Sequence, residues 1–167
     1  MSTKQDDAYM RLALEQARLA FDDGEVPVGA VLVRDGQVIA VGRNRREQLK
    51  NTLAHAEIEA ISGGSAALGG WRLLNCTLYV TLEPCPMCAG AIQNARIARL
   101  VYGCPDVNNG ACGSVCSMND IFYNHKVETE GGVLAAESRA LLDRFFSDLR
   151  KRRKAEKAVA GSGQTAE

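Results

Sequence analysis

The sequence predicts a layered α/β domain built around a mixed β-sheet. Along the 167 residues, short β-rich runs alternate with longer runs whose apolar residues recur at helical spacing. This alternation is typical of a sheet covered by helices. The dipeptide Asp35-Gly36 stands between two of the β-rich runs and indicates an antiparallel hairpin, which makes the sheet mixed. The length suits one domain, which we expect to span residues 1–157.

The first half of the chain is predicted to contain a helix, a hairpin and a second helix. Apolar residues at helical spacing mark the first helix over residues 10–21. The hairpin strands are expected over residues 28–33 and 37–41, and a polar loop is expected over residues 43–53. A short helix then opens at His55.

This second helix has Thr52 as a candidate cap, and Gly63-Gly64 is expected to end it. Residues 77–82 and 97–102 are predicted strands, and the helix between them begins at Cys85.

The remainder of the chain is predicted to end in one long helix. Residues 106–120 are rich in Gly, Asn and Ser and are expected to form a loop, with a short strand over residues 126–130. An amphipathic helix is expected over residues 134–157. Residues 158–167 are small and polar and are expected to be a disordered tail.

Two short motifs supply the side chains of a metal site. His55-Ala56-Glu57 is followed by Pro84-Cys85-Pro86-Met87-Cys88. A catalytic zinc ion has three protein ligands and an open fourth position, whereas a structural zinc ion usually has four ligands. We therefore predict that His55, Cys85 and Cys88 bind one zinc ion per chain. Glu57 is then free to act as a proton shuttle for a zinc-bound water.

Both motifs are expected at helix N-termini. Pro84 and Pro86 bracket Cys85, and an apolar helical run follows. The helix dipole and the free N–H groups at such a terminus stabilise thiolates. A Cys-x-x-Cys pair alone is also typical of a redox pair or of half a structural zinc site. The upstream His55 and Glu57 favour the catalytic interpretation.

Composition limits the other function classes. The formal net charge is zero, so nucleic-acid binding requires a local patch. Arg150-Lys151-Arg152-Arg153-Lys154 is one, although such runs are also common on solvated helix faces.

No apolar run approaches the ~20 residues needed to span a bilayer. No signal peptide is expected, which indicates a cytoplasmic location and reduced cysteines. Cys104, Cys112 and Cys116 are expected to be free thiols, with a second metal site as the alternative.

The chain resembles the cytidine deaminase superfamily and, within it, the bacterial tRNA-specific adenosine deaminases. The resemblance extends from about Tyr9 to Lys157. The His-x-Glu and Pro-Cys-x-x-Cys motifs carry it for the superfamily. Flanking stretches point to the subgroup, although guanine and cytosine deaminases share parts of them. These stretches are Glu25-Val26-Pro27-Val28-Gly29-Ala30-Val31, Asn44, Ala54-His55-Ala56-Glu57, Tyr79-Val80-Thr81-Leu82-Glu83-Pro84-Cys85, Met87-Cys88-Ala89-Gly90-Ala91, Asn124-His125 and Phe145-Phe146.

This resemblance implies a three-layer αβα, cytidine-deaminase-like fold with a central mixed five-stranded sheet. It also implies zinc-dependent hydrolytic deamination of adenosine to inosine in tRNA, at the wobble position of the anticodon. Glu57 would then be the catalytic general acid and base. The implied partners are the anticodon arm of a tRNA and a second copy of the chain in a homodimer.

The resemblance further implies a set of substrate contacts. Val28 and Asn44 would line the base pocket, and Phe146 and Arg150 would offer a stacking ring and a phosphate contact. Without the resemblance, Asn44 could equally cap a loop, and Phe145 and Phe146 would be core residues. The implied substrate-binding residues are Val28, Asn44, Asp106, Asn124, His125, Phe146 and Arg150.

Two loops depart from the usual pattern of these deaminases. The segment before His55 reads Lys50-Asn51-Thr52-Leu53-Ala54, and Asp106 is followed by Val107-Asn108-Asn109-Gly110. Two alternative functions remain open, namely deamination of free guanine or cytosine, and a non-catalytic, zinc-stabilised RNA-binding module. The basic run 150–154 favours RNA over a free base. Glu57 favours catalysis, because a structural zinc site has no use for an unligated carboxylate.

Overall fold

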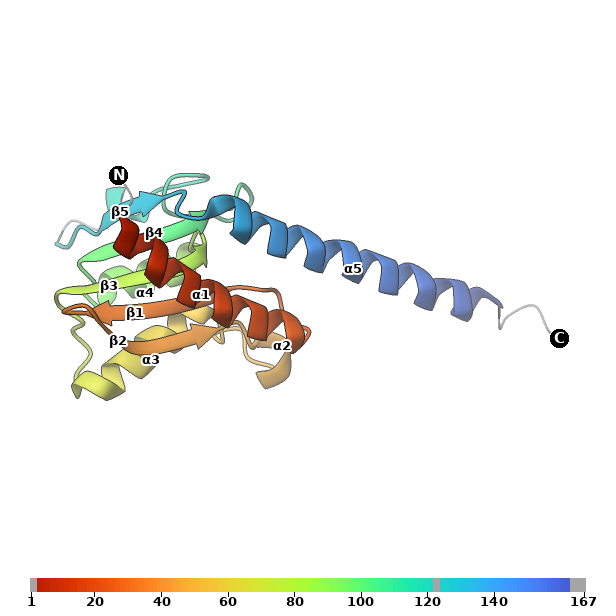
Figure 1. The fold of residues 1–167 in the computed structure, drawn as a ribbon, viewed down its shortest axis with the longest axis horizontal. Helices are drawn as coiled ribbons and strands as arrows, with labels where there is room; N and C mark the ends of the chain where they lie inside the picture. Colours follow the sequence, from red (N-terminus) through yellow and green to blue (C-terminus); the bar gives the residue numbers. More distant parts are fainter. Residues whose placement is uncertain (1–2, 122–123, 163–167) are drawn as a thin grey trace.

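The computed structural model describes residues 3–121 and 124–162, and in this part of the chain five strands form one mixed sheet between helices (Figure 1). The strand order is β2-β1-β3-β4-β5. β1 pairs antiparallel with β2 and β3, whereas β4 pairs parallel with β3 and β5. The strands are β1 (Gly29–Arg34), β2 (Gln37–Arg43), β3 (Cys76–Leu82), β4 (Arg99–Cys104) and β5 (Glu128–Gly131). The helices are α1 (Lys4–Asp22), α2 (Arg46–Leu49), α3 (Ala56–Leu68), α4 (Pro86–Asn94), the 3-10 turn η1 (Met118–Asp120) and α5 (Ala135–Ser162).

Each face of the sheet buries its own apolar cluster. Met10 of α1 packs with Val31 on one face, where α5 also lies. On the other face, Ala60 of α3 and Ile92 of α4 share a cluster with Leu32. Val31 and Leu32 are adjacent in β1 and belong to opposite clusters, because successive side chains of a strand point to opposite faces. The predicted three-layer arrangement is therefore confirmed.

The topology brings four chain segments to one edge of the sheet. β3 and β4 are parallel, so their carboxyl ends meet at this edge, just before Cys85 and Asp106. β1 runs antiparallel to both β3 and β2, so the residue before β1 and the residue after β2 lie there too. These residues are Val28 and Asn44. Ligand sites of α/β sheets commonly lie outside the carboxyl ends of the strands.

The expected end of the second helix at Gly63-Gly64 is wrong. α3 continues to Leu68 and ends at Gly69, which has a φ of +67° and adopts the left-handed conformation of a helix C-cap. Gly64 has a different purpose, because a Cβ there would lie 2.3 Å from Leu32 Cδ2. The glycine lets the helix pack closely against the sheet.

The connection between β2 and α3 also differs from expectation. Residues 46–49 form the short helix α2 within the predicted loop. The N-cap of α3 is His55, which makes no side-chain capping hydrogen bond, so Thr52 is not the cap. This leaves the imidazole of His55 available for other contacts.

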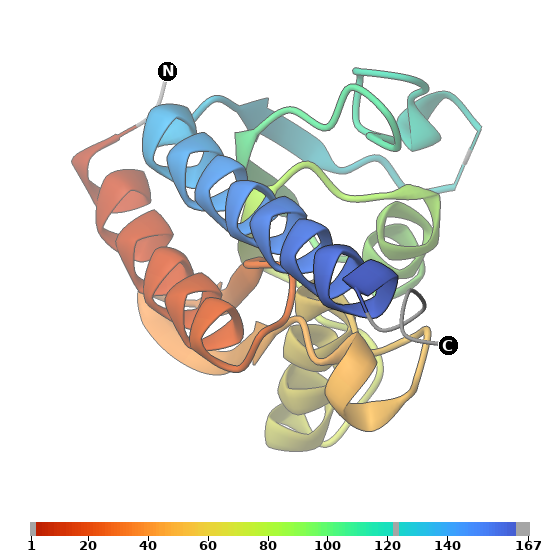
Figure 2. The ribbon, with the colours of Figure 1, turned by 90° about the vertical axis from the view of Figure 1, so that its right-hand side faces the viewer.

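Helix α5 is longer than predicted. The Phe145 ring of α5 meets the Phe21 ring of α1 edge-on at 5.8 Å between centroids. The first half of α5 lies beside α1 (Figure 2). Its second half extends past the sheet and reaches Ser162, so residues 158–162 are helical (Figure 1). The last part of the expected tail, residues 163–167, lies outside the described residues. No helix in the described part of the chain is long and apolar enough to cross a membrane.

Candidate metal centre and substrate pocket

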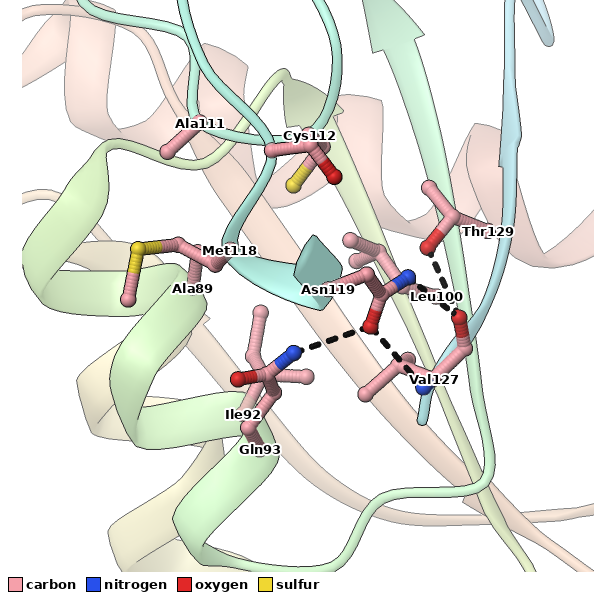
Figure 3. A pocket seen from close by; sticks show the side chains of 11 residues that line it. Ala89, Ile92, Gln93, Leu100, Ala111, Cys112, Met118, Asn119, Val127 and Thr129 are labelled. Atoms are coloured by element: carbon pink, nitrogen blue, oxygen red, sulfur yellow. Dashed lines mark hydrogen bonds between the residues drawn. The ribbon is translucent and has the colours of Figure 1, made fainter. Parts of the chain in front are cut away.

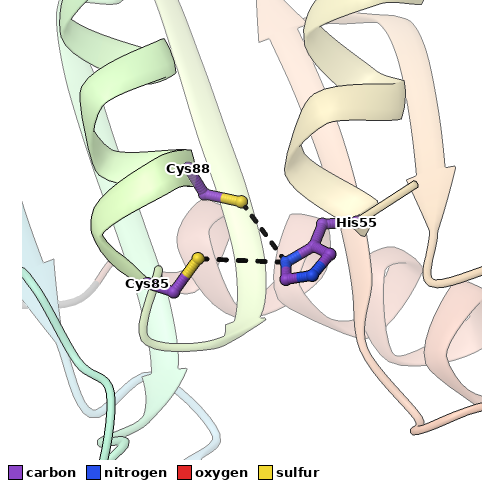
Figure 4. A group of neighbouring side chains, drawn as sticks. All are labelled: His55, Cys85 and Cys88. Atoms are coloured by element: carbon purple, nitrogen blue, oxygen red, sulfur yellow. Dashed lines mark hydrogen bonds between the residues drawn. The ribbon is translucent and has the colours of Figure 1, made fainter. Parts of the chain in front are cut away.

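Three ligand atoms from two helix N-termini face one another at the carboxyl edge of the sheet (Figure 4). His55 is the N-cap of α3 and Cys85 is the N-cap of α4. His55 Nδ1 lies 3.9 Å from Cys85 Sγ and 3.6 Å from Cys88 Sγ. All three ligand atoms lie within 4.8 Å of one another. The chain therefore brings together the three predicted metal ligands.

These distances fit a tetrahedral zinc ion. Zn–N and Zn–S bonds of about 2.0 and 2.3 Å at the tetrahedral angle put nitrogen and sulfur about 3.5 Å apart. The donor set of one imidazole and two thiols is also one that zinc accepts. Within the described residues, Cys104, Cys112 and Cys116 form no such group.

Hydrogen bonds connect the three side chains. The Cys88 thiol donates a hydrogen bond to Cys85 and is the main cause that lowers the Cys85 pKa to about 4. The same bond, together with burial, raises the pKa of Cys88 far above its ordinary value. The hydrogen bond to Cys85 also raises the pKa of His55. A divalent cation would bind the deprotonated ligands and balance their negative charge, so metal binding would release these protons.

Glu57 lies beside this group and is 4% exposed. Burial is the largest influence on its carboxyl group and raises its pKa to about 7, although its own backbone N–H, His55 and Cys88 favour the charged form. A carboxyl group with this pKa can both accept and release a proton near neutral pH. Glu57 is not one of the three grouped ligands, so a carboxyl group that can exchange protons lies beside them.

A cavity of about 300 Å³ opens onto the metal ligands and Glu57. The size is at the lower end of the range for small-molecule sites and suits a single base. Three of the predicted substrate contacts, Val28, Asn44 and Asp106, line it. The other lining residues, which are neither predicted metal ligands nor among the seven predicted substrate contacts, are Val26, Arg46, Ala56, Leu82, Glu83, Pro86 and Asn109.

Asn44 is held by a second buried carboxylate, that of Glu25. Its side-chain amide donates to the Val26 carbonyl at 3.2 Å and to Glu25 Oε2 at 3.5 Å. The other Glu25 oxygen accepts from the Gln48 backbone N–H at 2.6 Å, which ties α2 to the same point. Asn44 is 8% exposed, and no hydrogen bond to its carbonyl oxygen is found among the described residues. This oxygen can therefore accept from a ligand N–H.

A second cavity of about 370 Å³ adjoins the first and shares Val26, Asn44 and Arg46 with it. Phe146 and Arg150 of α5 line this cavity. Phe146 is 40% exposed, so the core interpretation is wrong for it, whereas Phe145 is buried at 5%. The predicted stacking ring and phosphate contact thus lie next to the catalytic cavity.

Asn124 and His125 are not brought to the cavity of their own chain. The Asn124 side-chain oxygen accepts from Arg96 Nη1 at 3.1 Å, and His125 Nε2 lies 2.8 Å from the Ile97 carbonyl. Both contacts lie past the C-terminal end of α4, whereas the metal ligands lie at its N-terminal end.

A further small cavity lies between α4 and the start of β5 (Figure 3). Asn119 ties the two together, because its side chain accepts from Gln93 and from the Val127 N–H and donates to the Val127 carbonyl. Cys112 lines this cavity from the loop above (Figure 3). The lining is mostly apolar, and the Asn119 bonds give the site a structural purpose.

Comparison with known proteins shows the family of this chain. Residues 4–150 match the model of the MafB19-like deaminases, and the chain belongs to this family of deaminases. It is 45% identical over 152 residues to the tRNA-specific adenosine deaminase of Bacillus subtilis, covering 90% of this chain and 94% of that one. It is 48% identical over 159 residues to the protein of the same name from Haemophilus influenzae, covering 94% and 92%.

Solved structures extend the comparison. A structure from a study of A-to-I editing by tRNA:A34 deaminases at the wobble position superposes with a TM-score of 0.75 at 45% identity, covering 81% of this chain and 99% of that one. A guanine deaminase from Nitrosomonas europaea gives a TM-score of 0.73 at 26% identity, covering 87% and 85%. The fold is shared by both substrate classes, whereas the higher identity lies with the tRNA deaminases.

Proposed function

We propose that this protein is a tRNA adenosine deaminase that converts adenosine to inosine at the wobble position of the anticodon. The observation that carries the proposal is the joint placement of His55, Cys85, Cys88 and Glu57 around a cavity of base size. The close relatives named tRNA-specific adenosine deaminase support the RNA substrate.

The metal proposed for the three ligands is one zinc ion per chain. When bound, zinc lowers the pKa of a water molecule to about 7, so that hydroxide is available at neutral pH. Cys85 and Cys88 at the start of α4 are placed where the helix dipole favours thiolates.

Glu57 moves the protons of the reaction. Its carboxylate takes a proton from the attacking water and delivers it to the purine ring, and the protonated group then assists the departure of ammonia. Its pKa of about 7 permits both directions of transfer in one reaction cycle. The buried position of Glu57 excludes bulk water from this exchange.

Val28 and Asn44 would hold the flipped-out base. Val28 offers an apolar wall and the Asn44 carbonyl oxygen offers an acceptor for a purine N–H. Asp106 lines the same cavity and would contact the neighbouring nucleotide. A tRNA loop suits such a pocket, because its bases are already unstacked and cost little to extrude.

The anticodon arm would be held by α5. Phe146 and Arg150 line the cavity that adjoins the catalytic one, and the basic run 150–154 continues along the exposed second half of the helix. An exposed aromatic ring can stack on a base, and guanidinium groups bind phosphates. This segment favours RNA over a free base as the substrate.

A homodimer would assign a purpose to Asn124 and His125. These residues lie at the far end of α4 from the cavity of their own chain. They could contact nucleotides that flank the target base only from a second copy of the chain. Because tRNA is the proposed substrate, we place the protein in the cytoplasm.

One assay separates the proposed function from its alternatives. Purified protein is incubated with bulk tRNA, and inosine is measured beside ammonia release from free adenosine, cytidine and guanine. The proposal expects inosine in tRNA and little turnover of the free compounds. Ammonia from guanine or cytosine without inosine in tRNA would assign the chain to the free-base deaminases. Binding of tRNA without any deamination would instead indicate a zinc-stabilised RNA-binding module.

A further inference from the structure

Glu83 is a buried carboxylate at the edge of the sheet that carries the active site. It follows β3 directly, precedes Pro84-Cys85 and is 2% exposed. Its two oxygens accept from the backbone N–H groups of Asp106, Cys112 and Ser114, each at 3.0 Å. The Ser114 hydroxyl donates to it as well. All four donors belong to the loop that the sequence predicted over residues 106–120.

No ion pair of Glu83 is found in residues 3–121 and 124–162. Its partners are instead the Ser114 hydroxyl and three backbone N–H groups. A buried charge is tolerated only when it is paired or fully hydrogen-bonded. The loop donors therefore supply the stabilisation that a cation would otherwise give.

The same loop forms a wall of the catalytic cavity. Asp106 and Asn109 line the cavity together with Glu83. Within the loop, Asp106 Oδ1 accepts from the N–H groups of Asn108 and Asn109 at 3.0 and 3.1 Å. These bonds fix Asn109 relative to Asp106, and Glu83 fixes Asp106 relative to the sheet.

Gly110 shows how closely the loop encloses the carboxylate. A Cβ at this position would lie 2.4 Å from the Glu83 carboxylate and 2.5 Å from the Asp106 carbonyl oxygen. The next residue, Ala111, donates its N–H to the Pro84 carbonyl at 2.8 Å. The loop is thus bound to the two residues that immediately precede the metal ligand Cys85.

We propose that Glu83 is a positioning residue that holds the loop 105–114 around its carboxylate and thereby fixes Asp106 and Asn109 in the wall of the substrate pocket. The inference rests on the proposed function, because it assigns the residue that shapes the same pocket. Contacts made through this wall would hold the substrate in both the ground state and the transition state. Their loss raises KM and leaves kcat nearly unchanged.

The test compares Glu83→Gln and Ser114→Ala in zinc-loaded enzyme with bulk tRNA as the substrate. Gln keeps the shape but turns one acceptor into a donor that faces N–H groups. We expect KM to rise about tenfold in Glu83→Gln and about threefold in Ser114→Ala, which removes one of the four donors. Zinc content and kcat should stay close to those of the unmodified enzyme.

Tyr79→Phe is the matched control. The Tyr79 hydroxyl donates to the buried Asp6 carboxylate at 2.9 Å, so this variant also loses a hydrogen bond to a buried carboxylate. It touches neither the loop nor the cavity, and its KM should equal that of the unmodified enzyme. An equal rise of KM in Tyr79→Phe would reduce the role of Glu83 to general stability.

A second readout does not depend on activity. Amide hydrogen exchange should accelerate in Glu83→Gln at residues 106–114 and not in the strands. Unchanged KM in both loop variants, unchanged exchange of the loop, or a KM rise that follows zinc loss would each overturn the proposal. Ser114→Ala decides alone if Glu83→Gln does not fold. Absence of inosine formation by the unmodified enzyme would instead refute the proposed function, and the exchange measurement would still test the anchoring of the loop.

Discussion

Glu57 at one edge of the sheet and Asp6 towards the opposite edge are 4% and 2% exposed, yet their surroundings differ in kind. Asp6 accepts from Arg99 Nη1 at 2.6 Å, from the Tyr79 hydroxyl at 2.9 Å and from the Thr3 backbone N–H at 2.9 Å. No ion pair of Glu57 occurs among the described residues, where its neighbours are the predicted metal ligands.

The pKa values of the two carboxyl groups are therefore shifted in opposite directions. Burial raises the pKa of Glu57 to about 7. Burial also acts to raise the pKa of Asp6, but Arg99, Thr3 and Tyr79 outweigh it and hold the pKa well below its ordinary value. Burial alone thus does not determine the direction in which the pKa of a carboxyl group shifts. A fully partnered carboxylate stabilises the fold, whereas one left with few partners costs stability and is available for proton transfer.

The largest effect in this comparison is expected for Glu57→Gln. The variant keeps the shape of the side chain and removes the proton shuttle, so the rate of deamination should fall by on the order of 10²–10⁴. Inosine formation under saturating tRNA measures this loss. A rate close to that of the unmodified enzyme would contradict the assigned role.

Stability provides the control for Glu57→Gln. A raised pKa means that the folded protein binds more protons than the unfolded chain, so the charged form of Glu57 destabilises the fold as pH rises from about 4.5 to about 7. The metal-free variant should therefore be at least as stable as metal-free unmodified protein at pH 8, and the difference should vanish near pH 4. Urea unfolding at the two pH values tests the sign.

Asp6→Asn is expected to lower the stability of the fold and to leave the activity unchanged, which is the reverse of the result for Glu57→Gln. It removes the buried one of three charge partners of Arg99, which also pairs with Glu128 and Glu130, so the free energy of unfolding at pH 7 should fall by about 2 kcal/mol. Zinc content and the KM for tRNA should not change in the folded variant, because Asp6 lies far from the cavity. Thermal unfolding combined with the tRNA assay checks both statements.

The pH dependence of Asp6→Asn has a definite direction. The Asp6 pKa is lowered on folding, so its stabilisation is present above the ordinary Asp pKa of about 4 and is lost as the pH falls below that value. The stability difference between the variant and the unmodified protein should shrink in acid. A difference that grows with falling pH would contradict the pairing.

The smallest expected effect concerns the basic run of α5. Replacing Arg150, Arg152 and Arg153 with Ala should weaken tRNA binding and flatten its salt dependence by about 0.7–0.9 in log–log slope for each phosphate that the helix no longer binds. Zinc content should be unchanged. If affinity and slope both stay the same, the run is only a solvated helix face, and binding must come from residues such as Arg43, Arg45, Arg46 and Lys50.

The sequence predicted which side chains meet at the candidate metal site, because that information is local. His55, Cys85 and Cys88 stand in two short motifs with fixed spacing, and each motif begins a helix. Val28 and Asp106 were expected only from the family resemblance, and the structure places both beside strand ends at the edge where ligands commonly bind. The fold class followed from the order of strands and helices and from one hairpin dipeptide.

The supporting carboxylates could not be predicted in the same way. Glu25 holds Asn44, and Glu83 holds a loop whose donors lie 23 to 31 positions away. Their roles depend on loops that meet only after the sheet has formed. The sole signal was a charged residue beside an otherwise apolar run, a position where an acid is seldom buried without partners.

The glycines of α3 also show that packing can override a local sequence preference. Gly63-Gly64 looked like a helix end, because glycine lowers helix propensity. The close contact between Gly64 and Leu32 makes the glycine necessary within the helix, and packing overrides the local preference. The exposure of Phe146 was likewise undetermined by sequence, since it depends on how far α5 extends beyond the sheet.

The central claim is that three side chains hold the metal while Glu57 stays free to move protons. Zinc content of purified unmodified protein, Glu57→Gln and Cys88→Ala tests it most directly. We predict about one zinc ion per chain in the first two and clearly less in Cys88→Ala. Full zinc content in Cys88→Ala, or loss of zinc in Glu57→Gln, would contradict the account.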